Sequence, residues 1–351
     1  MEKVIVRMPN WLGDLIMSTP VLMALRKCLP NAHITALCQS NVADLLLANP
    51  HVDKIWNYNK PKNRHEKRAI ILELKEKKFD TGVLLTNSIS SAWWFFRGNV
   101  KNRIGFSNNI DIRSILLSQA VSFPKNRKNQ HLVLTYLSLL GANKQDVFHK
   151  LPELYVTEKE KIAAKKILKN HGWAQEQKII GICPGAAFGT AKRWLPERFR
   201  AVAEKLSRED SAQIIFLGNK SEIELSKTIC QAPQIINLVG KTSLRELISI
   251  ISVCDVFLAN DSGPMHIAAA LQTPLVALFG PTDATVSRPY PNGKVIQRHV
   301  SCSPCHRREC PHDHACMKAI GVDEVYEALR EQLSSPLRQQ RTDSLNLINH
   351  P

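Results

Sequence analysis

Short apolar runs alternate with longer amphipathic stretches along most of this sequence. In the first half, β-rich runs that predict strands lie at 3–8, 33–38, 52–56 and 81–85. Helices are predicted after them, beginning at Ser18–Thr19–Pro20 and spanning 65–78 and 131–140. The second half repeats the pattern, with strands predicted at 178–183, 213–217, 234–238, 255–259 and 274–279. Its predicted helices span 158–170, 196–207, 221–230, 243–253, 263–271 and 322–333.

Such alternation predicts an α/β fold, in which parallel sheets carry helices on both faces. Right-handed crossovers would place the carboxyl ends of the strands, and any ligand, at one edge of each sheet. The length of 351 residues suggests two domains. We expect residues 1–157 and 158–335 to form them, with a boundary near 141–156 and a loose polar tail at 336–351.

Charge and hydropathy restrict the location and the partners. The net charge is +16, which favours a phosphorylated substrate, an anionic membrane or a nucleic acid, although it also fits a merely solvated basic surface. No apolar run reaches the roughly 18 residues that cross a bilayer. The first residues, MEKVIVRMPNW, are too short and too polar for a signal peptide. We therefore expect a cytoplasmic protein.

The segment PNWLGD follows the first predicted strand directly. Gly13 allows a tight or positive-φ turn, and Asp14 would then lie at the carboxyl edge of the sheet. A partly desolvated carboxylate there can act as a general base toward a hydroxyl. Alternatively, Asp14 only caps the following helix or shapes the turn. The segment is not a GxGxxG fingerprint, so no dinucleotide cofactor is indicated.

Two further segments follow strands of the second half. In CPGAAFGTAKRW, Gly185 and Gly189 permit close backbone approach, and Lys192 and Arg193 can neutralise a phosphate. A glycine-rich surface turn with incidental basic residues is the alternative. No GxxxxGK[ST] loop is present.

In NDSGPMHIAAA, Asp261 and Ser262 occupy the position of a helix N-cap, and Gly263 begins the helix. Free N–H groups at a helix start bind pyrophosphate well, and His266 could add a donor one turn further on. An ordinary capped turn with a satisfied histidine is the alternative.

Four cysteines cluster near the end, at Cys302, Cys305, Cys310 and Cys316, among several histidines. Thiolates and imidazoles at this density suit Zn²⁺, but the spacing matches no common zinc or iron–sulfur pattern. Reduced cysteines or a facultative disulfide in an ordered loop are favoured over a metal site.

Basic residues gather in the first half at Lys60, Lys62, Arg64, Lys67 and Arg68, and again at 125–128. The aromatic run Trp93–Trp94–Phe95–Phe96 lies between these clusters in the sequence. Solvated charge and a buried aromatic helix explain both features. A basic rim beside an apolar patch, suited to an anionic lipid headgroup, is the alternative.

Taken together, RMPNWLGDLIMSTP, CPGAAFGTAKRW and NDSGPMHIAAALQTPLVALFGPTD resemble the ADP-heptose:lipopolysaccharide heptosyltransferases of glycosyltransferase family 9. PNWLGD and SCSPCHRRECPHDHAC are most similar to members that add the second core heptose. The resemblance covers about residues 1–335. It implies a GT-B fold, with two Rossmann-like domains facing a cleft and the acceptor bound by the first. A member acting at another core position is the alternative.

The resemblance also assigns roles to residues. It implies an inverting, metal-independent transfer of heptose from ADP-heptose to heptosyl-Kdo-lipid A, without a cofactor, by an enzyme peripheral on the inner face of the inner membrane. Asp14 would be the general base, and Lys192 would stabilise departing ADP. The donor site would comprise Gly185, Lys192, Glu222, Asp261, Ser262, Gly263 and His266. The ribose contact at Glu222 is loosely aligned, because Glu224 is close by. Lys60, Lys62, Arg64 and Arg68 would face the acceptor and the membrane.

Three other classes compete with this interpretation. A sugar-nucleotide epimerase or hydrolase can use the same fold, but the missing dinucleotide fingerprint weighs against an epimerase. A nucleic-acid-binding protein would explain the charge and predicts strongly salt-dependent binding. A non-catalytic lipopolysaccharide-binding module would keep the basic rim but would not need Asp14. We expect no nucleic acid among the partners.

Overall fold

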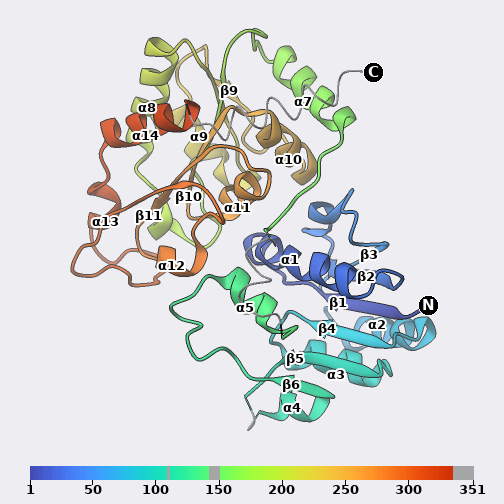
Figure 1. Ribbon diagram of the computed structural model, residues 1–351. Helices are drawn as coiled ribbons and strands as arrows, with labels where there is room; N and C mark the ends of the chain where they lie inside the picture. The colour runs from blue at the N-terminus through green and yellow to red at the C-terminus, as the bar shows by residue number, and fades with distance from the viewer. Residues whose placement is uncertain (109–110, 142–150, 335–351) are drawn as a thin grey trace. The chain divides into compact units, whose positions relative to one another are not determined.

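The computed structural model describes residues 1–108, 111–141 and 151–334, in two compact units, Met1–Tyr155 and Val156–Pro351 (Figure 1). The polar tail predicted at 336–351 lies outside the described residues. Among the residues that the structure describes, no helix is long and apolar enough to cross a membrane.

The first unit contains a six-stranded parallel sheet in the order β3-β2-β1-β4-β5-β6. Its strands are β1 (Lys3–Arg7), β2 (His33–Gln39), β3 (Lys54–Tyr58), β4 (Thr81–Leu84), β5 (Asn102–Phe106) and β6 (Gln119–Val121). The chain runs outward from β1 to β3 and then restarts beside β1 with β4. The strand order therefore reverses between β1 and β4, where α/β sheets bind ligands.

Helices cover both faces of this sheet. They are α1 (Leu12–Cys28), η1 (Ala43–Leu46), α2 (Arg64–Lys77), α3 (Ile89–Arg97), α4 (Ile112–Leu116) and α5 (Leu132–Ser138). Helix α1 packs against α5, whereas α2 packs against α3 and α3 against α4. Right-handed crossovers change face where the strand order reverses, which explains these two groups.

The predicted start of the first helix at Ser18 is wrong, because α1 begins six residues earlier, at Leu12. Ser18 and Thr19 are buried inside the helix, and their hydroxyls donate to the carbonyls of Leu15 and Ile16, both at 2.8 Å. Pro20 has no N–H for the Ile16 carbonyl, and the Thr19 hydroxyl supplies that hydrogen bond instead. A motif typical of a helix start is thus accommodated within a helix.

The second unit repeats the same topology, with the sheet order β12-β11-β10-β7-β8-β9 and parallel pairing throughout. Its strands are β7 (Ile179–Cys183), β8 (Gln213–Phe216), β9 (Ile236–Asn237), β10 (Val256–Asn260), β11 (Leu275–Phe279) and β12 (Lys294–Gln297). Its helices are α7 (Glu158–Asn170), η2 (Thr190–Lys192), α8 (Pro196–Glu209), η3 (Lys220–Glu222), α9 (Ile223–Ile229), α10 (Leu244–Val253), α11 (Gly263–Ala270), α12 (Ala284–Ser287), α13 (Ala315–Lys318) and α14 (Val322–Leu333). The strand order reverses between β7 and β10. The predicted α/β fold is confirmed.

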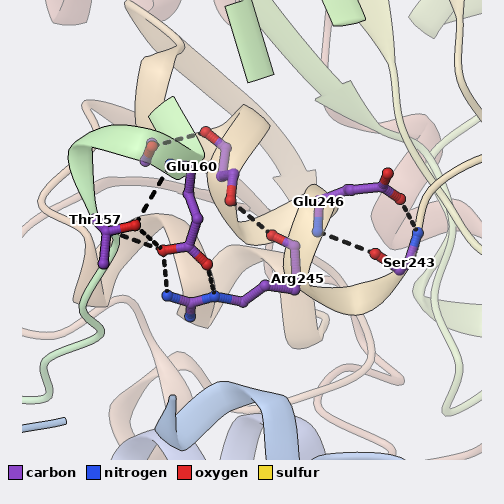
Figure 2. Close-up of polar contacts among 7 residues, drawn as sticks. Thr157, Glu160, Ser243, Arg245 and Glu246 are labelled. Carbon is purple, nitrogen blue, oxygen red and sulfur yellow. Dashed lines mark hydrogen bonds and ion pairs between the residues drawn. The ribbon is translucent and has the colours of Figure 1, made fainter. Parts of the chain in front are cut away.

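Helix α7 is held to α10 by a shared carboxylate, as Figure 2 shows. The Thr157 hydroxyl accepts from the Glu160 N–H, and the Glu160 carboxylate accepts from the Thr157 N–H at 2.8 Å, which forms a capping box. Arg245 of α10 donates to both oxygens of the same carboxylate through Nε and Nη2, the latter at 2.8 Å. These bonds hold the pKa of Glu160 down to about 2. They fix the helix that leads into β10.

Candidate functional site

The loops after β7 and β10 lie side by side at the carboxyl edge of the second sheet, because these two strands are hydrogen-bonded neighbours. The strand order reverses between them, so this edge offers a crevice for a ligand. Lys192 belongs to η2 in the loop after β7, and Asp261 directly follows β10. The structure therefore brings together two site residues that the sequence separates widely.

Lys192 and Asp261 form an ion pair in which Nζ lies 2.5 Å from Oδ2. The side chains are only 12% and 5% exposed, and Asp261 also accepts from the Thr282 hydroxyl at 2.6 Å. The Lys192 ammonium lies 4.8 Å from the centre of the Phe188 ring. This geometry holds one positive charge at a fixed place on the edge of the sheet. A carboxylate repels phosphate, so of these two side chains Lys192 is the candidate for an anion contact, while Asp261 holds its ammonium in place.

Asn260 organises this edge, although no sequence motif pointed to it. The side chain is completely buried at the end of β10. Its Nδ2 donates to the Pro184 carbonyl at 2.8 Å, and its Oδ1 accepts from the Trp194 N–H at 3.1 Å. Asn260 thus ties both ends of the loop that carries Lys192 to the neighbouring strand. A polar amide ending the apolar run VFLAN was the available signal.

Helix α11 begins at the same edge with an uncapped first turn. Ser262 is the N-cap residue, but its hydroxyl oxygen is buried and has no hydrogen-bond partner among the described residues. Gly263 is the first helical residue, and His266 is buried one turn later, 6% exposed. The first N–H groups of a helix carry partial positive charge, and here no side chain of the cap satisfies them. An anion fits this position.

Glu222 lies at the same edge, beyond β8, and is 3% exposed. Its carboxylate packs directly on Gly185 and Gly218, where a Cβ atom would approach it to 1.8 and 2.5 Å. It accepts from the Asn219 N–H at 2.9 Å, and burial raises its pKa. Glu224 instead is exposed and pairs with Lys227. The space left by the missing side chain of Gly185 is therefore occupied by the Glu222 carboxylate. Of the two glutamates, Glu222 is the better candidate for a contact with a ligand hydroxyl.

In the first unit, Asp14 lies half-buried in the first turn of α1, beyond the carboxyl end of β1. Gly13 is helical and is not among the positive-φ residues of the described chain, so the predicted tight turn is wrong. Helix α1 packs against α5, which carries Tyr136. Burial, and secondarily the charge of Asp14, raises the pKa of that tyrosine well above its usual value. The position beside the reversal of the strand order suits a base.

Arg113 of α4 is a buried cation that no sequence motif indicated. It is 1% exposed, and Nη2 donates to the Thr86 carbonyl at 2.7 Å. Nε and Nη1, and the Thr86 hydroxyl, are buried without a hydrogen-bond partner among the described residues. Burial lowers the pKa of Arg113. The loops after β4 and β5 therefore hold an incompletely satisfied guanidinium, whose chemistry suits an anion.

The basic clusters of the first unit occupy both ends of one sheet edge. Lys60, Lys62, Arg64 and Arg68 are exposed between β3 and the first turns of α2. The exposed cluster 125–128 follows β6. Since β3 and β6 are the outer strands of a parallel sheet, both clusters lie at its carboxyl edge.

Exposed apolar side chains follow the strands between these clusters. Trp11 follows β1, Ile89 begins α3 after β4, and Ile112 and Ile115 belong to α4 after β5, with exposures of 61%, 49%, 68% and 77%. The aromatic run is divided, because Trp94 and Phe95 are buried, whereas Trp93 and Phe96 are 45% and 42% exposed. The run is therefore neither a fully buried aromatic helix nor a fully exposed apolar patch.

The four clustered cysteines are free thiols that line one cavity of about 160 Å³, together with His312 and Ala191. Within the described part of the chain, no three His, Cys, Asp or Glu side chains are arranged to hold a metal ion. Burial raises the pKa of Cys316. Because Ala191 adjoins Lys192, the cavity borders the loop at the carboxyl edge of β7.

The family model for glycosyltransferase family 9 (heptosyltransferase) matches residues 67–316. The chain belongs to this family. A lipooligosaccharide heptosyltransferase 2 of Campylobacter jejuni is 33% identical, over 95% of this chain and 100% of that protein. The structure of ADP-heptose lipopolysaccharide heptosyltransferase II of E. coli is 27% identical and has a TM-score of 0.81, over 95% of this chain and 98% of that one.

Members with other names in this family are less similar. Lipopolysaccharide heptosyltransferase 3 of Escherichia coli is 28% identical over 81% of this chain and 85% of that protein. Lipopolysaccharide heptosyltransferase 1 of Campylobacter coli is 29% identical over 77% of this chain and 82% of that protein. The chain is thus a glycosyltransferase with a GT-B type fold, and the resemblance found in the sequence is confirmed.

Proposed function

We propose that this glycosyltransferase moves L-glycero-D-manno-heptose from ADP-heptose to the first heptose of the lipopolysaccharide inner core. The main support is the carboxyl edge of the second sheet. There Lys192 and the uncapped start of α11 lie together, where the strand order reverses between β7 and β10. The Campylobacter relative and the E. coli structure, both of the second type, favour this position in the core. A heptosyltransferase I or III activity is the alternative.

The donor diphosphate fits this edge because it offers an ammonium and helix N–H groups close together. As the bond to the sugar breaks, negative charge grows on ADP, and preorganised positive groups stabilise it. Lys192 and the first turn of α11 supply that stabilisation without a metal or cofactor. Asp261 orients Lys192, and Glu222 and His266 bind hydroxyls of the donor. Gly185 leaves the space that the Glu222 carboxylate occupies, and Gly263 admits the ligand close to the backbone at the start of α11.

The acceptor hydroxyl requires a base, which we assign to Asp14. The acceptor oxygen attacks the anomeric carbon, its proton passes to the Asp14 carboxylate, and the bond to the ADP oxygen breaks with inversion. The buried Arg113 offers a counter-ion for an acidic group of the acceptor. A phosphorylated or carboxylated acceptor also matches the net charge of +16.

The direct test is transfer from ADP-heptose to truncated acceptors that carry zero, one or two heptoses on Kdo-lipid A. We expect product only with the acceptor carrying one heptose. Preference for the acceptor without heptose would indicate the type I activity, and preference for two heptoses the type III activity. Absence of transfer to all three acceptors, with the enzyme folded, would refute the proposed function.

We further propose that the enzyme is cytoplasmic and binds the inner face of the inner membrane peripherally. The exposed basic clusters and the apolar side chains Ile112 and Ile115 share the carboxyl edge of the first sheet, where Asp14 also lies. Each basic residue near an anionic surface contributes about 1 kcal/mol, so several hold a protein there reversibly.

Vesicle sedimentation tests this surface. The protein should bind phosphatidylglycerol vesicles at low salt and dissociate at high salt, because salt screens exposed charges. Replacing Lys60, Lys62, Arg64, Lys67 and Arg68 by Gln should weaken binding and leave ADP affinity unchanged. Unchanged sedimentation of this variant would exclude the segment as the docking surface.

A further inference from the structure

The cysteine-rich segment 301–316 crosses the edge that carries the donor site. On one side, the Ser303 hydroxyl donates to the Gly280 carbonyl at 2.5 Å, and the His306 N–H donates to the Pro281 carbonyl at 2.8 Å, in the loop after β11. On the other side, the Arg308 carbonyl accepts from the Ala191 N–H at 3.0 Å, in the loop after β7. Strand β10 lies between β11 and β7, so the segment spans the loop that contains Asp261.

The backbone of Arg308 packs tightly against the loop that carries Lys192, in addition to the hydrogen bond with Ala191. Gly189 leaves room for the Arg308 backbone, because a Cβ atom at Gly189 would lie 2.1 Å from the Arg308 carbonyl oxygen. Its φ of 162° is extended, so glycine is needed here for space rather than for conformation. The contact therefore fixes where the Arg308 side chain begins.

The Arg308 side chain returns to the same aromatic ring as Lys192. Its guanidinium carbon lies 5.3 Å from the centre of the Phe188 ring, and the Lys192 ammonium lies 4.8 Å from it. Phe188 remains 36% exposed, and Arg308 is exposed. Two cations therefore meet at one exposed ring, beside the start of α11. A dianionic phosphate group that reaches this ring is attracted by both cations.

We propose that Arg308 is a further donor-binding residue, which contacts the diphosphate of the nucleotide together with Lys192. A guanidinium can bind two phosphate oxygens at once, whereas the Lys192 ammonium acts as a point charge. The cysteine-rich segment then forms one wall of the donor site, and its four free thiols line the adjacent cavity. This inference rests on the proposed function, because it requires an ADP-linked donor.

Calorimetric titration with ADP tests the proposal on the full-length protein. Arg308→Ala should weaken ADP binding about tenfold, the lower end for a charge-assisted contact, because the side chain is exposed. Arg308→Lys should recover part of this loss, since it keeps the charge but not the bidentate geometry. Arg307→Ala is the matched control, because Arg307 is the adjacent residue and lines the cysteine cavity instead.

The outcomes separate the two hypotheses. If wild type does not bind ADP, the proposed function fails. If wild type binds ADP and Arg308→Ala binds it equally tightly, the role of Arg308 is refuted. Equal losses in Arg307→Ala and Arg308→Ala would also refute it, because they would indicate a general effect of surface charge. Circular dichroism melting of each variant checks folding, and a lowered melting temperature in Arg308→Ala alone would assign Arg308 to the packing of the loop.

Discussion

Replacing Lys192 should reduce both stability and donor binding, and a second substitution separates these effects. Lys192→Met removes the ammonium and keeps a side chain of similar length. It leaves the Asp261 carboxylate, 5% exposed, without the charge that now lies 2.5 Å away. Adding Asp261→Asn removes that buried charge and keeps an oxygen that can accept from Thr282. The double variant should therefore regain stability without regaining the cation.

The structure sets the expected magnitudes. Breaking a buried ion pair costs about 3–5 kcal/mol. Because the Lys192 side chain is still 12% exposed, we expect the lower end, about 3 kcal/mol. In a unit of this size, each kcal/mol lowers the melting temperature by about 2–4 °C, so Lys192→Met should melt about 6–12 °C lower. Replacing both partners is often nearly neutral. Both variants should bind ADP about 10- to 150-fold more weakly, since a charge-assisted contact contributes about 1.5–3 kcal/mol.

Circular dichroism melting and calorimetric titration with ADP measure the two quantities. The matched control is Lys227→Met with Glu224→Asn, an exposed pair in the same unit that is 65% and 83% exposed. We expect little change in the control, because exposed pairs contribute little. Wild-type ADP affinity in the double variant would remove Lys192 from the donor site. An unchanged melting temperature in Lys192→Met would refute the stabilising role of the pair.

Three further predictions concern the base, the acid stability and the metal requirement. Asp14→Asn should lower turnover by about 10²–10⁴-fold, the usual contribution of a general base, with ADP affinity unchanged in titration; near-normal turnover would exclude Asp14. The pKa of Glu160 is depressed from 4.5 to about 2, so its pairing with Arg245 stabilises the fold above pH 4.5 and is lost as the pH falls toward 2. Arg245→Met should therefore be less stable in urea unfolding at pH 7 and progressively closer to the wild type below pH 4.5, although Thr157 keeps part of the pKa shift; a pH-independent difference would contradict this linkage. Transfer should persist in EDTA; restoration by Mg²⁺ would contradict the metal-independent mechanism, and restoration by Zn²⁺ alone, with refolding, would indicate a metal at the cysteines.

The sequence was sufficient to predict the fold class and to identify the strand ends that are followed by polar residues. Asp14, Lys192 and Asp261 each follow an apolar run, and the parallel topology places them at sheet edges as expected. It was not sufficient for the start of α1. There the hydroxyls of Ser18 and Thr19 serve the preceding turn, a pattern that looks identical to an N-cap in one dimension.

Long-range contacts explain what the sequence could not predict. Asn260 and Arg308 both contact the loop after β7. In the sequence, however, Asn260 ends β10 and Arg308 follows β12. Their proximity depends on the sheet order, which alternation alone does not determine. Arg113 was missed for a related reason, because a basic residue in the run RSILL looks like an exposed position on a helix.

The two units share one strand order, but different charged groups lie at the two points where the order reverses, Asp14 in the first unit and the Lys192–Asp261 pair in the second. In the second unit, the Asp261 carboxylate is engaged by the Lys192 ammonium and by the Thr282 hydroxyl, and its side chain is only 5% exposed. We therefore propose the base for the acceptor hydroxyl on the other sheet, at Asp14, which is half-buried at the start of α1. Conversely, a leaving diphosphate needs cations and helix N–H groups, and the second unit supplies both. In the proposed mechanism, duplication of a single topology keeps the proton acceptor and the anion site on separate sheets.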